Sequence, residues 1–312
     1  MNLLIVDLFS EDYRKILQPK FPEISIHAFA NKGEVGGIIE KTHILLSHPS
    51  GISDQLIKKA SKLQWIQALG TGVDGFLNLP SLKKGVLITS ARGIHGPQMS
   101  EMAFLLMLAF NRNFPQVVRN QDRRVWERWP AKLLYHKKVG ILGVGVVGEE
   151  IARKCKAFGM TVYGIDVVKR KVEAVDHFYG PEELLQVVAE VDYFIIVVPS
   201  TPQTQRMIGA KVLSCMKPTS FLINIARGTI VDEEALIDAL RAGKIAGAGL
   251  DVFCEEPLPK DHPFWRMQNV IVTPHMGGLT DIYVEQVIPI FEENISRFLQ
   301  GKKDKLINIV ER

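Results

Sequence analysis

Short apolar runs alternate with helical stretches along the first part of the chain, up to about Ser90. The runs are LLIVDLF, ISIHAF, HILLSH, WIQALG and VLITSA, and the stretch SDQLIKKASKL between two of them has apolar residues at helical spacing. Strands that alternate with helices form a mostly parallel sheet. The pattern therefore predicts an α/β domain at the start of the chain.

A long apolar stretch separates this region from a second alternation. The stretch GPQMSEMAFLLMLAFNRNF has Pro97 at its start and apolar residues nearly all round, which predicts a buried helix. From Lys138 onward the runs that we interpret as strands are KVGILG, TVYGID, DYFIIVVP, SFLINIA, AGAGLDVF and NVIVTP. Six parallel strands with intervening helices are typical of a doubly wound nucleotide-binding domain.

The last part of the chain does not fit the second sheet. LTDIYVEQVIPIFEENISRFLQ predicts a helix that is interrupted or kinked at Pro289, and KLINIV after it is interpreted as one more strand. A strand that the second sheet does not need could return to the first domain. We therefore expect an α/β protein of two domains, each a doubly wound, mostly parallel sheet, with the first domain discontinuous.

Composition and charge exclude several classes of protein. Of the 312 residues, 46% are hydrophobic and 23% charged, as in a folded, water-soluble protein. The net charge is +4 and basic clusters such as Lys169–Lys171 are scattered, so nothing indicates nucleic-acid binding. No run approaches the about 18 apolar residues of a membrane helix, so we expect no membrane partner.

The cysteines and the start of the chain indicate a compartment. Cys155, Cys215 and Cys254 are far apart in sequence and have no C-x-x-C or His partner, so we interpret them as reduced core residues and expect no metal site. The start MNLLIVDLF lacks a basic leader and contains Asp7, which favours a first strand over a signal peptide. The expectation is a cytoplasmic protein.

The strongest chemical signal is the glycine pattern in GVGVVG. Gly143, Gly145 and Gly148 form G-x-G-x-x-G between an apolar strand and a helix, and Asp166 closes the next strand. Such glycines permit a tight turn, close approach of a pyrophosphate to backbone N–H groups, and close packing of helix on strand. A glycine-rich turn without a ligand is the alternative, but the strand–turn–helix context favours a bound dinucleotide.

Asp166 bears on which dinucleotide is bound. A carboxylate at this place can accept hydrogen bonds from the adenosine ribose and would repel a 2'-phosphate, which favours NAD(H) over NADP(H). Lys169, Arg170 and Lys171 follow closely, and one of them could reach a phosphate. NADP(H) therefore stays open as the alternative.

Ionisable residues follow the last three strands. Arg227 comes after the fourth strand of the second region, Glu255 and Glu256 after the fifth, and His275 after the sixth. Ligands collect at the carboxyl ends of parallel strands, so these side chains can converge on one site. Alone, each has an ordinary explanation as an ion pair, a solvated acid or a structural imidazole. Together, a guanidinium could hold a carboxylate while an imidazole supported by a glutamate exchanges a proton with a carbonyl oxygen, which is the chemistry of 2-keto acid reduction.

A family resemblance runs over most of the chain. GVGVVG with Asp166, NIARGTIVDEEAL, GAGLDVFCEEP and TPHMGG, in this order and spacing, resemble the D-isomer-specific 2-hydroxyacid dehydrogenases, and LGTGVDGF and RGIHGPQMSEMAFLLML resemble that family's substrate-domain loop and joining helix. The resemblance implies a flavodoxin-like substrate domain over 1–99 and 283–312 and a Rossmann domain over 100–282. It also implies hydride transfer between NAD(H) and a small 2-keto or D-2-hydroxy acid, with glyoxylate and hydroxypyruvate as first expectations. By the same resemblance the protein would be a homodimer, mediated by the long helix after Pro97 and the loop region that follows it.

The same resemblance gives single residues a role. His275 would be the general acid or base, Glu256 its partner and Arg227 the substrate anchor, with Glu255 as the spare acid. Backbone N–H groups of Thr71, Gly72 and Val73 would hold the substrate carboxylate, and Asp251 the nicotinamide amide. The expected cofactor-binding residues are Gly143, Gly145, Val146, Val147, Gly148, Asp166, Pro199, Thr204, Ala226, Arg227, Asp251, His275 and Gly277.

Several alternatives stay open. Trp126 lies where relatives acting on glyoxylate or hydroxypyruvate place a tryptophan near the partner's site, but an ordinary packed indole is an equal alternative. His48, Arg92 and His95 could contribute to substrate choice, although capping or surface roles are more frequent. Other activities within the family are formate oxidation, disfavoured because Glu256 is present, and phosphoglycerate oxidation. A nicotinamide-sensing co-repressor is the alternative from another class, disfavoured because no long disordered tail is present.

Overall fold

The computed structural model describes residues 1–311 of the chain. The chain divides into two compact units, Met1–Ile94 with Thr280–Arg312, and His95–Leu279. The sequence-based boundaries, 1–99 with 283–312 and 100–282, place the two junctions a few residues further along the chain.

The first unit is built on a five-stranded parallel sheet with the strand order β2-β1-β3-β4-β5. This is the flavodoxin-like order, so the predicted fold class is confirmed for this unit. The strands are β1 Asn2–Val6, β2 Ser25–Phe29, β3 Ile44–Ser47, β4 Trp65–Ala68 and β5 Leu87–Thr89, one for each apolar run identified in the sequence.

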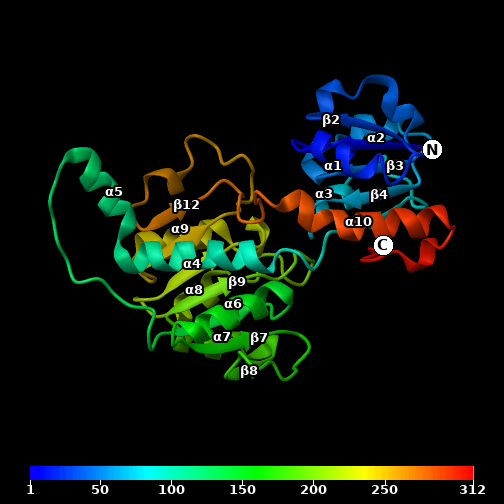
Figure 1. The fold of residues 1–312 in the computed structure, drawn as a ribbon. Coiled ribbons are helices and arrows are strands. Elements are labelled where there is room, and N and C mark those ends of the chain that lie inside the picture. The colour runs from blue at the N-terminus through cyan, green and yellow to red at the C-terminus, as the bar shows by residue number, and fades with distance from the viewer. Residues whose placement is uncertain (312) are drawn as a thin grey trace. The chain divides into compact units, whose positions relative to one another are not determined.

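Helices cover both faces of this sheet because successive strand residues point to opposite sides. On one face, Leu3 and Ile5 of β1 pack with α1 (Ser10–Leu17) and α10 (Tyr283–Leu299). On the other face, Leu4 and Val6 pack with α2 (Asp54–Lys59) and α3 (Asp74–Leu77). The first sheet is therefore sandwiched, and the red helix α10 from the end of the chain lies against it in Figure 1.

At the end of the chain, the expected interruption of the helix at Pro289 and the expected last strand are both wrong, while a kink at Pro289 stays a prediction. Helix α10 is not interrupted but continues through Pro289, because the burial of Val287, Ile288 and Phe291 outweighs the one backbone hydrogen bond that a proline removes. The run KLINIV is not a strand. Only Ile309 forms a bridge, to Thr89, since Asn308 has a left-handed φ of 57° that breaks the extended backbone.

The second unit contains a seven-stranded parallel sheet with the order β12-β11-β10-β9-β6-β7-β8. The order reverses between β6 and β9, as in Rossmann folds. Its strands are β6 Lys138–Leu142, β7 Thr161–Ile165, β8 His177–Tyr179, β9 Tyr193–Ile196, β10 Phe221–Asn224, β11 Gly247–Leu250 and β12 Val270–Val272. The six predicted strands are confirmed, and β8 was missed because it has three residues and pairs only with β7 at the sheet edge.

Two helical layers enclose the second sheet. One contains α4 (Gly96–Arg112) and α6 (Val146–Ala157), and α4 is the buried helix that the sequence predicts. The other contains α7 (Leu184–Glu190), α8 (Ala210–Cys215) and α9 (Glu233–Arg241). Helix α5 (Phe114–Arg123) packs on neither face, and Figure 1 shows it and the segment after it reaching outward from the sheet.

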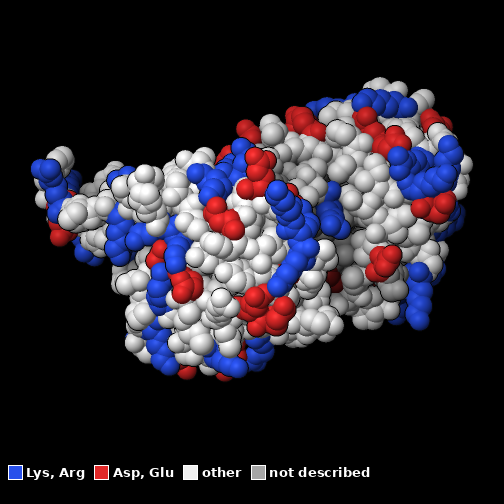
Figure 2. All heavy atoms as spheres, turned by 90° about the horizontal axis from the view of Figure 1, so that it is seen from below, with Lys and Arg blue, Asp and Glu red and all other residues white. Residues whose placement is uncertain are grey.

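The three cysteines differ in exposure, and charged side chains of both signs are mixed on the surface (Figure 2). Cys155 is buried and Cys215 half-buried, but Cys254 is exposed, so the expectation of a core residue is wrong for Cys254 because it lies in an outward-facing loop after β11. Acidic and basic side chains are interspersed on the face that Figure 2 displays.

Neither membrane spans nor metal ligands are apparent in the described part of the chain. No helix within residues 1–311 combines the length and apolar character needed to cross a bilayer. Within the same residues, no three His, Cys, Asp or Glu side chains come together as a metal-binding group.

Candidate active site

The residues singled out in the second unit lie at one edge of its sheet. The glycine turn follows β6, Asp166 follows β7, Arg227 follows β10, Asp251 follows β11 and His275 follows β12. All the strands are parallel, so these positions share the carboxyl edge. Each side chain is thus placed by the end of a buried strand, which gives the loops a rigid base.

The glycine turn has the geometry of a dinucleotide cradle. Gly143 has a φ of 101°, and a Cβ on Gly148 would lie 2.0 Å from the Gly143 carbonyl oxygen, so both positions require glycine. A Cβ on Gly145 would meet nothing within 4 Å, which leaves open space beside the N-terminus of α6. These residues fit a bound pyrophosphate, because a helix N-terminus with free access favours an anion.

Asp166 is tied to the same turn. Its Oδ2 accepts a hydrogen bond of 2.8 Å from the Val144 backbone N–H, and its Oδ1 accepts a weaker one from Val168 N–H at 3.4 Å. The carboxylate is therefore held at the mouth of the glycine turn, where the sequence places an acceptor for a ribose.

His275 and Glu256 form a close pair. His275 Nδ1 lies 2.6 Å from Glu256 Oε2, and Glu256 Oε1 accepts a 3.0 Å hydrogen bond from the Phe253 N–H. The side chains are 44% and 35% exposed, so the pair is at the surface of its unit rather than fully buried. With Nδ1 occupied by the carboxylate, Nε2 is the ring nitrogen available to another partner.

The electrostatics of the pair favour an ionised Glu256. Partial burial opposes ionisation, but the hydrogen bond from His275, the one from Phe253 N–H and the charges of His275 and Arg227 outweigh it. The pKa of Glu256 is therefore lowered from its ordinary value of 4.5. An ionised glutamate can stabilise a protonated imidazole, as a proton-transfer pair requires.

Backbone geometry also distinguishes His275. Its φ is 50°, in the left-handed region that residues other than glycine seldom adopt, and its N–H donates to the Thr273 carbonyl at 3.0 Å. Asp251 fixes this turn. Its side chain, in a residue only 1% exposed, accepts hydrogen bonds from the Thr273 hydroxyl (2.6 Å), the Met276 N–H (3.0 Å) and the Gly277 N–H (2.9 Å).

Sequence reasoning assigned Asp251 to the nicotinamide amide and missed its contacts with the histidine loop. The nicotinamide contact stays a prediction. The signal for these contacts is Asp251 at the end of one buried strand and the turn T-P-H-M-G at the end of the next. A buried aspartate needs several hydrogen-bond donors, and that turn supplies them.

Asn224, which the sequence analysis did not single out, positions Arg227. The Asn224 amide donates to the Arg227 carbonyl at 2.9 Å and accepts from the Ala226 N–H at 3.1 Å. A Cβ on Gly228 would lie 1.9 Å from the Phe253 carbonyl carbon, so the Arg227 turn packs directly on the loop that carries Glu256. These contacts bring Arg227 to the His275–Glu256 pair, whose carboxylate feels its charge.

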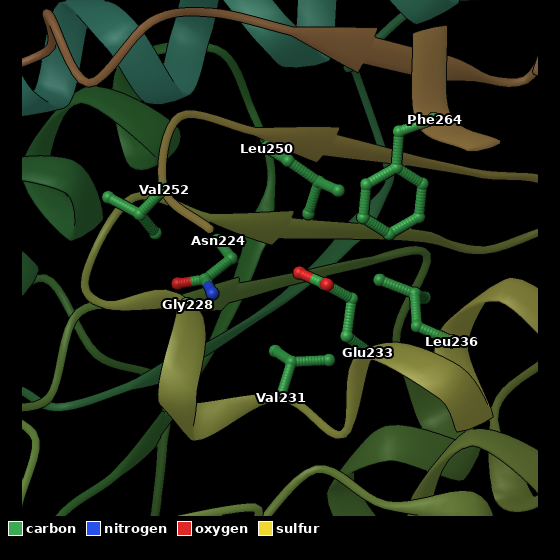
Figure 3. A pocket seen from close by; sticks show the side chains of 8 residues that line it. All are labelled: Asn224, Gly228, Val231, Glu233, Leu236, Leu250, Val252 and Phe264. Atoms are coloured by element: carbon green, nitrogen blue, oxygen red, sulfur yellow. The ribbon is translucent and has the colours of Figure 1, made fainter. Parts of the chain in front are cut away.

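A small cavity behind this turn is not the active site. Figure 3 shows its lining, which is mostly apolar: Asn224, Gly228, Val231, Glu233, Leu236, Leu250, Val252 and Phe264. Its volume of about 10 Å³ has room for about one water molecule and none for a substrate.

The remaining expected cofactor residues differ in accessibility. Val146 is exposed, Val147 packs into the core beneath the turn, and Ala226 is buried. Pro199 is exposed, and the Thr204 hydroxyl donates to its carbonyl at 2.8 Å, which shapes the loop after β9. Gly277 is buried, with its N–H given to Asp251. Their cofactor contacts stay predictions.

The expected substrate residues of the first unit lie at the carboxyl edge of its own sheet. Thr71, Gly72 and Val73 follow β4 and lead into α3. His48 follows β3, where its Nε2 lies 3.9 Å from Asp7 Oδ2.

The other two residues considered for substrate choice lie where the units begin and end. Arg92 is exposed, and its carbonyl accepts a hydrogen bond from the Asn308 amide at 2.8 Å. His95, in the second unit, is buried just before α4. No role in substrate choice is assigned to either residue by these contacts.

Trp126 is not a packed indole. It is 91% exposed in the segment that follows α5. That alternative is therefore wrong within the described unit, and the side chain is available to a partner.

Known proteins with similar sequences agree with this geometry. Residues 104–277 match the family model described as D-isomer specific 2-hydroxyacid dehydrogenase, NAD binding domain. The chain is 34% identical over 306 residues to D-3-phosphoglycerate dehydrogenase of Methanocaldococcus jannaschii, covering 97% of this chain but 58% of that protein. It is 33% identical over 267 residues to glyoxylate reductase of Korarchaeum cryptofilum, covering 83% of this chain and 79% of that one.

A solved structure extends the similarity to the whole fold. The D-isomer specific 2-hydroxyacid dehydrogenase from Xanthobacter autotrophicus, in complex with NADPH and MES, is 30% identical, with a TM-score of 0.84 over 99% of this chain and 98% of that one. The family model matches more than half of the chain, and the glyoxylate reductase is matched over most of its length. The resemblance seen in the sequence is thereby confirmed, and the chain belongs to the D-isomer-specific 2-hydroxyacid dehydrogenase family.

Proposed function

We propose that this protein reduces small 2-keto acids to D-2-hydroxy acids with a nicotinamide cofactor, and that in the reverse reaction it oxidises the D-2-hydroxy acids. The observation that carries the proposal is the 2.6 Å pair of His275 and Glu256, held beside Arg227 at the sheet edge that also bears the glycine turn. A proton donor, an anion anchor and a dinucleotide cradle on one edge are the parts that keto-acid reduction needs.

The chain's own residues would act as follows. The Arg227 guanidinium orients the substrate carboxylate and polarises the neighbouring carbonyl. A bound reduced nicotinamide supplies the hydride that the keto carbon accepts. His275 Nε2 donates a proton to the carbonyl oxygen, while Glu256 on Nδ1 fixes the tautomer and stabilises the cationic ring.

The cofactor is NAD(H) in preference, with NADP(H) also accepted. The Asp166 carboxylate at the mouth of the glycine turn supports NAD(H), because it would repel a 2'-phosphate. The similar Xanthobacter protein was solved with NADPH, which supports keeping both cofactors in any assay. As substrates we propose glyoxylate or hydroxypyruvate, supported by the glyoxylate reductase among the relatives. A phosphoglycerate-type activity is the second candidate, supported by the Methanocaldococcus relative.

We further propose that the protein is a homodimer. The outer face of α5 exposes Phe114, Val117 and Val118 at helical spacing, and Trp126 beyond it is more exposed still. Apolar surface gathered on a projecting segment is typical of a protein interface. A molar mass of twice 35.0 kDa by light scattering is expected. The three free thiols support a reducing, cytoplasmic location.

The direct test is a steady-state assay at the reduced-nicotinamide absorbance band. Purified protein is mixed with NADH or NADPH and with glyoxylate, hydroxypyruvate, pyruvate or phosphohydroxypyruvate. His275→Asn is the matched variant, because asparagine tolerates the positive φ at this position. We expect turnover with at least one acid and a loss of about 10²- to 10⁴-fold in kcat for the variant, with cofactor still bound.

Two outcomes would contradict the proposal. Equal turnover of His275→Asn and the wild type would remove His275 from proton transfer. Absence of turnover with all four acids, while NADH binds, would instead favour the nicotinamide-sensing alternative.

A further inference from the structure

The basic side chains after β7 are held in different ways. Lys169 Nζ lies 2.6 Å from Glu183 Oε2 and 3.8 Å from Glu182 Oε1, so it is directed toward the start of α7. Arg170 forms an ion pair with Glu149 in the first turns of α6, and its Nη2 donates to the Val144 carbonyl at 2.6 Å. Lys171 is exposed and forms no ion pair within residues 1–311.

Val144 therefore links the two groups that bear on the cofactor. Its N–H donates to Asp166, and its carbonyl accepts from Arg170. The Arg170 guanidinium and the Asp166 carboxylate are thus both hydrogen-bonded to the backbone of Val144, in the glycine turn. An arginine at this place could pair with a 2'-phosphate, but its guanidinium is already paired with Glu149.

We propose that Glu149 is a specificity-determining residue that disfavours NADP(H) by neutralising Arg170. This inference rests on the proposed dinucleotide site. Glu149 and Arg170 are 42% and 43% exposed, so the ion pair itself contributes little to stability and can be exchanged for another anion. The carboxylate also adds a second negative charge, beside Asp166, to the surface that a 2'-phosphate would approach.

Removing the Glu149 charge should release Arg170 for a phosphate. In Glu149→Gln, Arg170 keeps its hydrogen bond to the Val144 carbonyl, but its positive charge is no longer neutralised by a carboxylate. We expect the Kd for NADP⁺ to fall about tenfold, because a screened unit charge near a phosphate has an effect of that order. The Kd for NAD⁺ should change less than about twofold, since NAD⁺ has no 2'-phosphate to sense the change.

The experiment is isothermal titration of NAD⁺ and NADP⁺ into the purified protein, which measures binding without turnover. The matched control is Glu150→Gln. Glu150 is the next residue of α6 and pairs with Arg153 on the same helix at 2.5 Å. This control should leave both Kd values unchanged. Adding Arg170→Met to Glu149→Gln should abolish the gain, and the gain should shrink as salt is raised.

The outcomes separate this inference from the proposed function. Binding of neither dinucleotide to the wild type would overturn the proposed dinucleotide site itself. NAD⁺ binding with no gain for NADP⁺ in Glu149→Gln would overturn the role of Glu149 alone. A gain that survives Arg170→Met but is lost with Lys171→Met would overturn the assignment to Arg170.

Discussion

At the scale of single residues, the Glu256 carboxylate accepts a hydrogen bond from the His275 imidazole and stabilises its protonated form. The pKa of Glu256 is lowered from 4.5, so its carboxylate stays ionised to a lower pH than an ordinary glutamate does and is ionised at neutral pH. Its negative charge is therefore available to a protonated His275 wherever the enzyme is assayed.

Glu256→Gln tests this support. Glutamine keeps an oxygen for the Phe253 N–H but loses the charge, so the protonated imidazole loses its anionic partner. We expect the reductive kcat to fall about 10- to 100-fold, because the imidazole loses the carboxylate that orients it. Glu255→Gln, which changes the exposed neighbour, is the control. Equal losses in both variants would argue against a special role for Glu256.

Asp251 is the other residue with a separable role, in positioning His275. Asp251→Asn leaves one acceptor oxygen for three donors, so at least one buried N–H or O–H loses its partner. We expect a loss of about 1–3 kcal/mol in the free energy of unfolding, together with a fall in kcat, because the histidine loop is held less firmly. Denaturant unfolding and steady-state kinetics measure the two effects.

Thr273→Val provides the comparison for Asp251. It removes the Thr273 hydroxyl and leaves no buried donor without an acceptor, so the loss in the free energy of unfolding should be smaller than for Asp251→Asn. A Thr273→Val variant as unstable as Asp251→Asn would show that the Asp251 side chain is not the organiser of this loop.

At the scale of elements, the contact between β6 and α6 depends on two glycines with different surroundings. Gly148→Ala would place a methyl group 2.0 Å from the Gly143 carbonyl oxygen, so α6 must move away from β6. We expect a loss of about 1–3 kcal/mol in stability, which exceeds the gain in helix propensity from glycine to alanine. The thermal midpoint should fall accordingly.

Gly145→Ala is the matched variant on the same turn. Its methyl group would meet no protein atom within 4 Å, so the thermal midpoint should stay close to that of the wild type. The methyl group would narrow the space for a pyrophosphate, so NAD⁺ binding should weaken instead. If Gly145→Ala lowered stability and left binding intact, the cradle would be structural only.

Elements with a strong apolar period could be predicted from the sequence, and short or irregular ones could not. The buried strands of both sheets are continuous apolar runs, which only burial on both faces explains. Strand β8 has three residues at a sheet edge and carries no such run. The run KLINIV has strand composition, but the left-handed Asn308 and the hydrogen bonds of Asn294 to Ile307 decide its conformation.

The candidate site shows the same division. Arg227, Glu256 and His275 could be found because each follows a strand of a parallel sheet. Asn224 and the second role of Asp251 could not, because their hydrogen bonds depend on turns whose geometry arises only in the folded chain. Arg227, Glu256 and His275 therefore stand out in the sequence, whereas Asn224 and the hydrogen bonds of Asp251 are found only in the contacts of the folded chain.

At the scale of the whole molecule, the exposed Trp126 raises the question of which site it serves. A side chain that is 91% exposed contributes little to its own unit, and the apolar face of α5 beside it favours a second copy of the chain as its partner. In the proposed homodimer, Trp126 of one protomer would then line the active site of the other.

Subunit mixing distinguishes action within a protomer from action on its partner. Trp126→Ala should raise KM for the keto acid and leave NADH binding unchanged, and His275→Asn should lower kcat about 10²- to 10⁴-fold. In a heterodimer of the two variants, action on the partner leaves one site with both a native His275 and a native Trp126. We therefore expect a wild-type KM with about half the wild-type kcat, as one site of two works. Action within the protomer instead predicts the raised KM of Trp126→Ala, because the only site with a functional histidine then lacks its tryptophan. A light-scattering mass of one chain for the wild type would exclude the partner arrangement before any mixing.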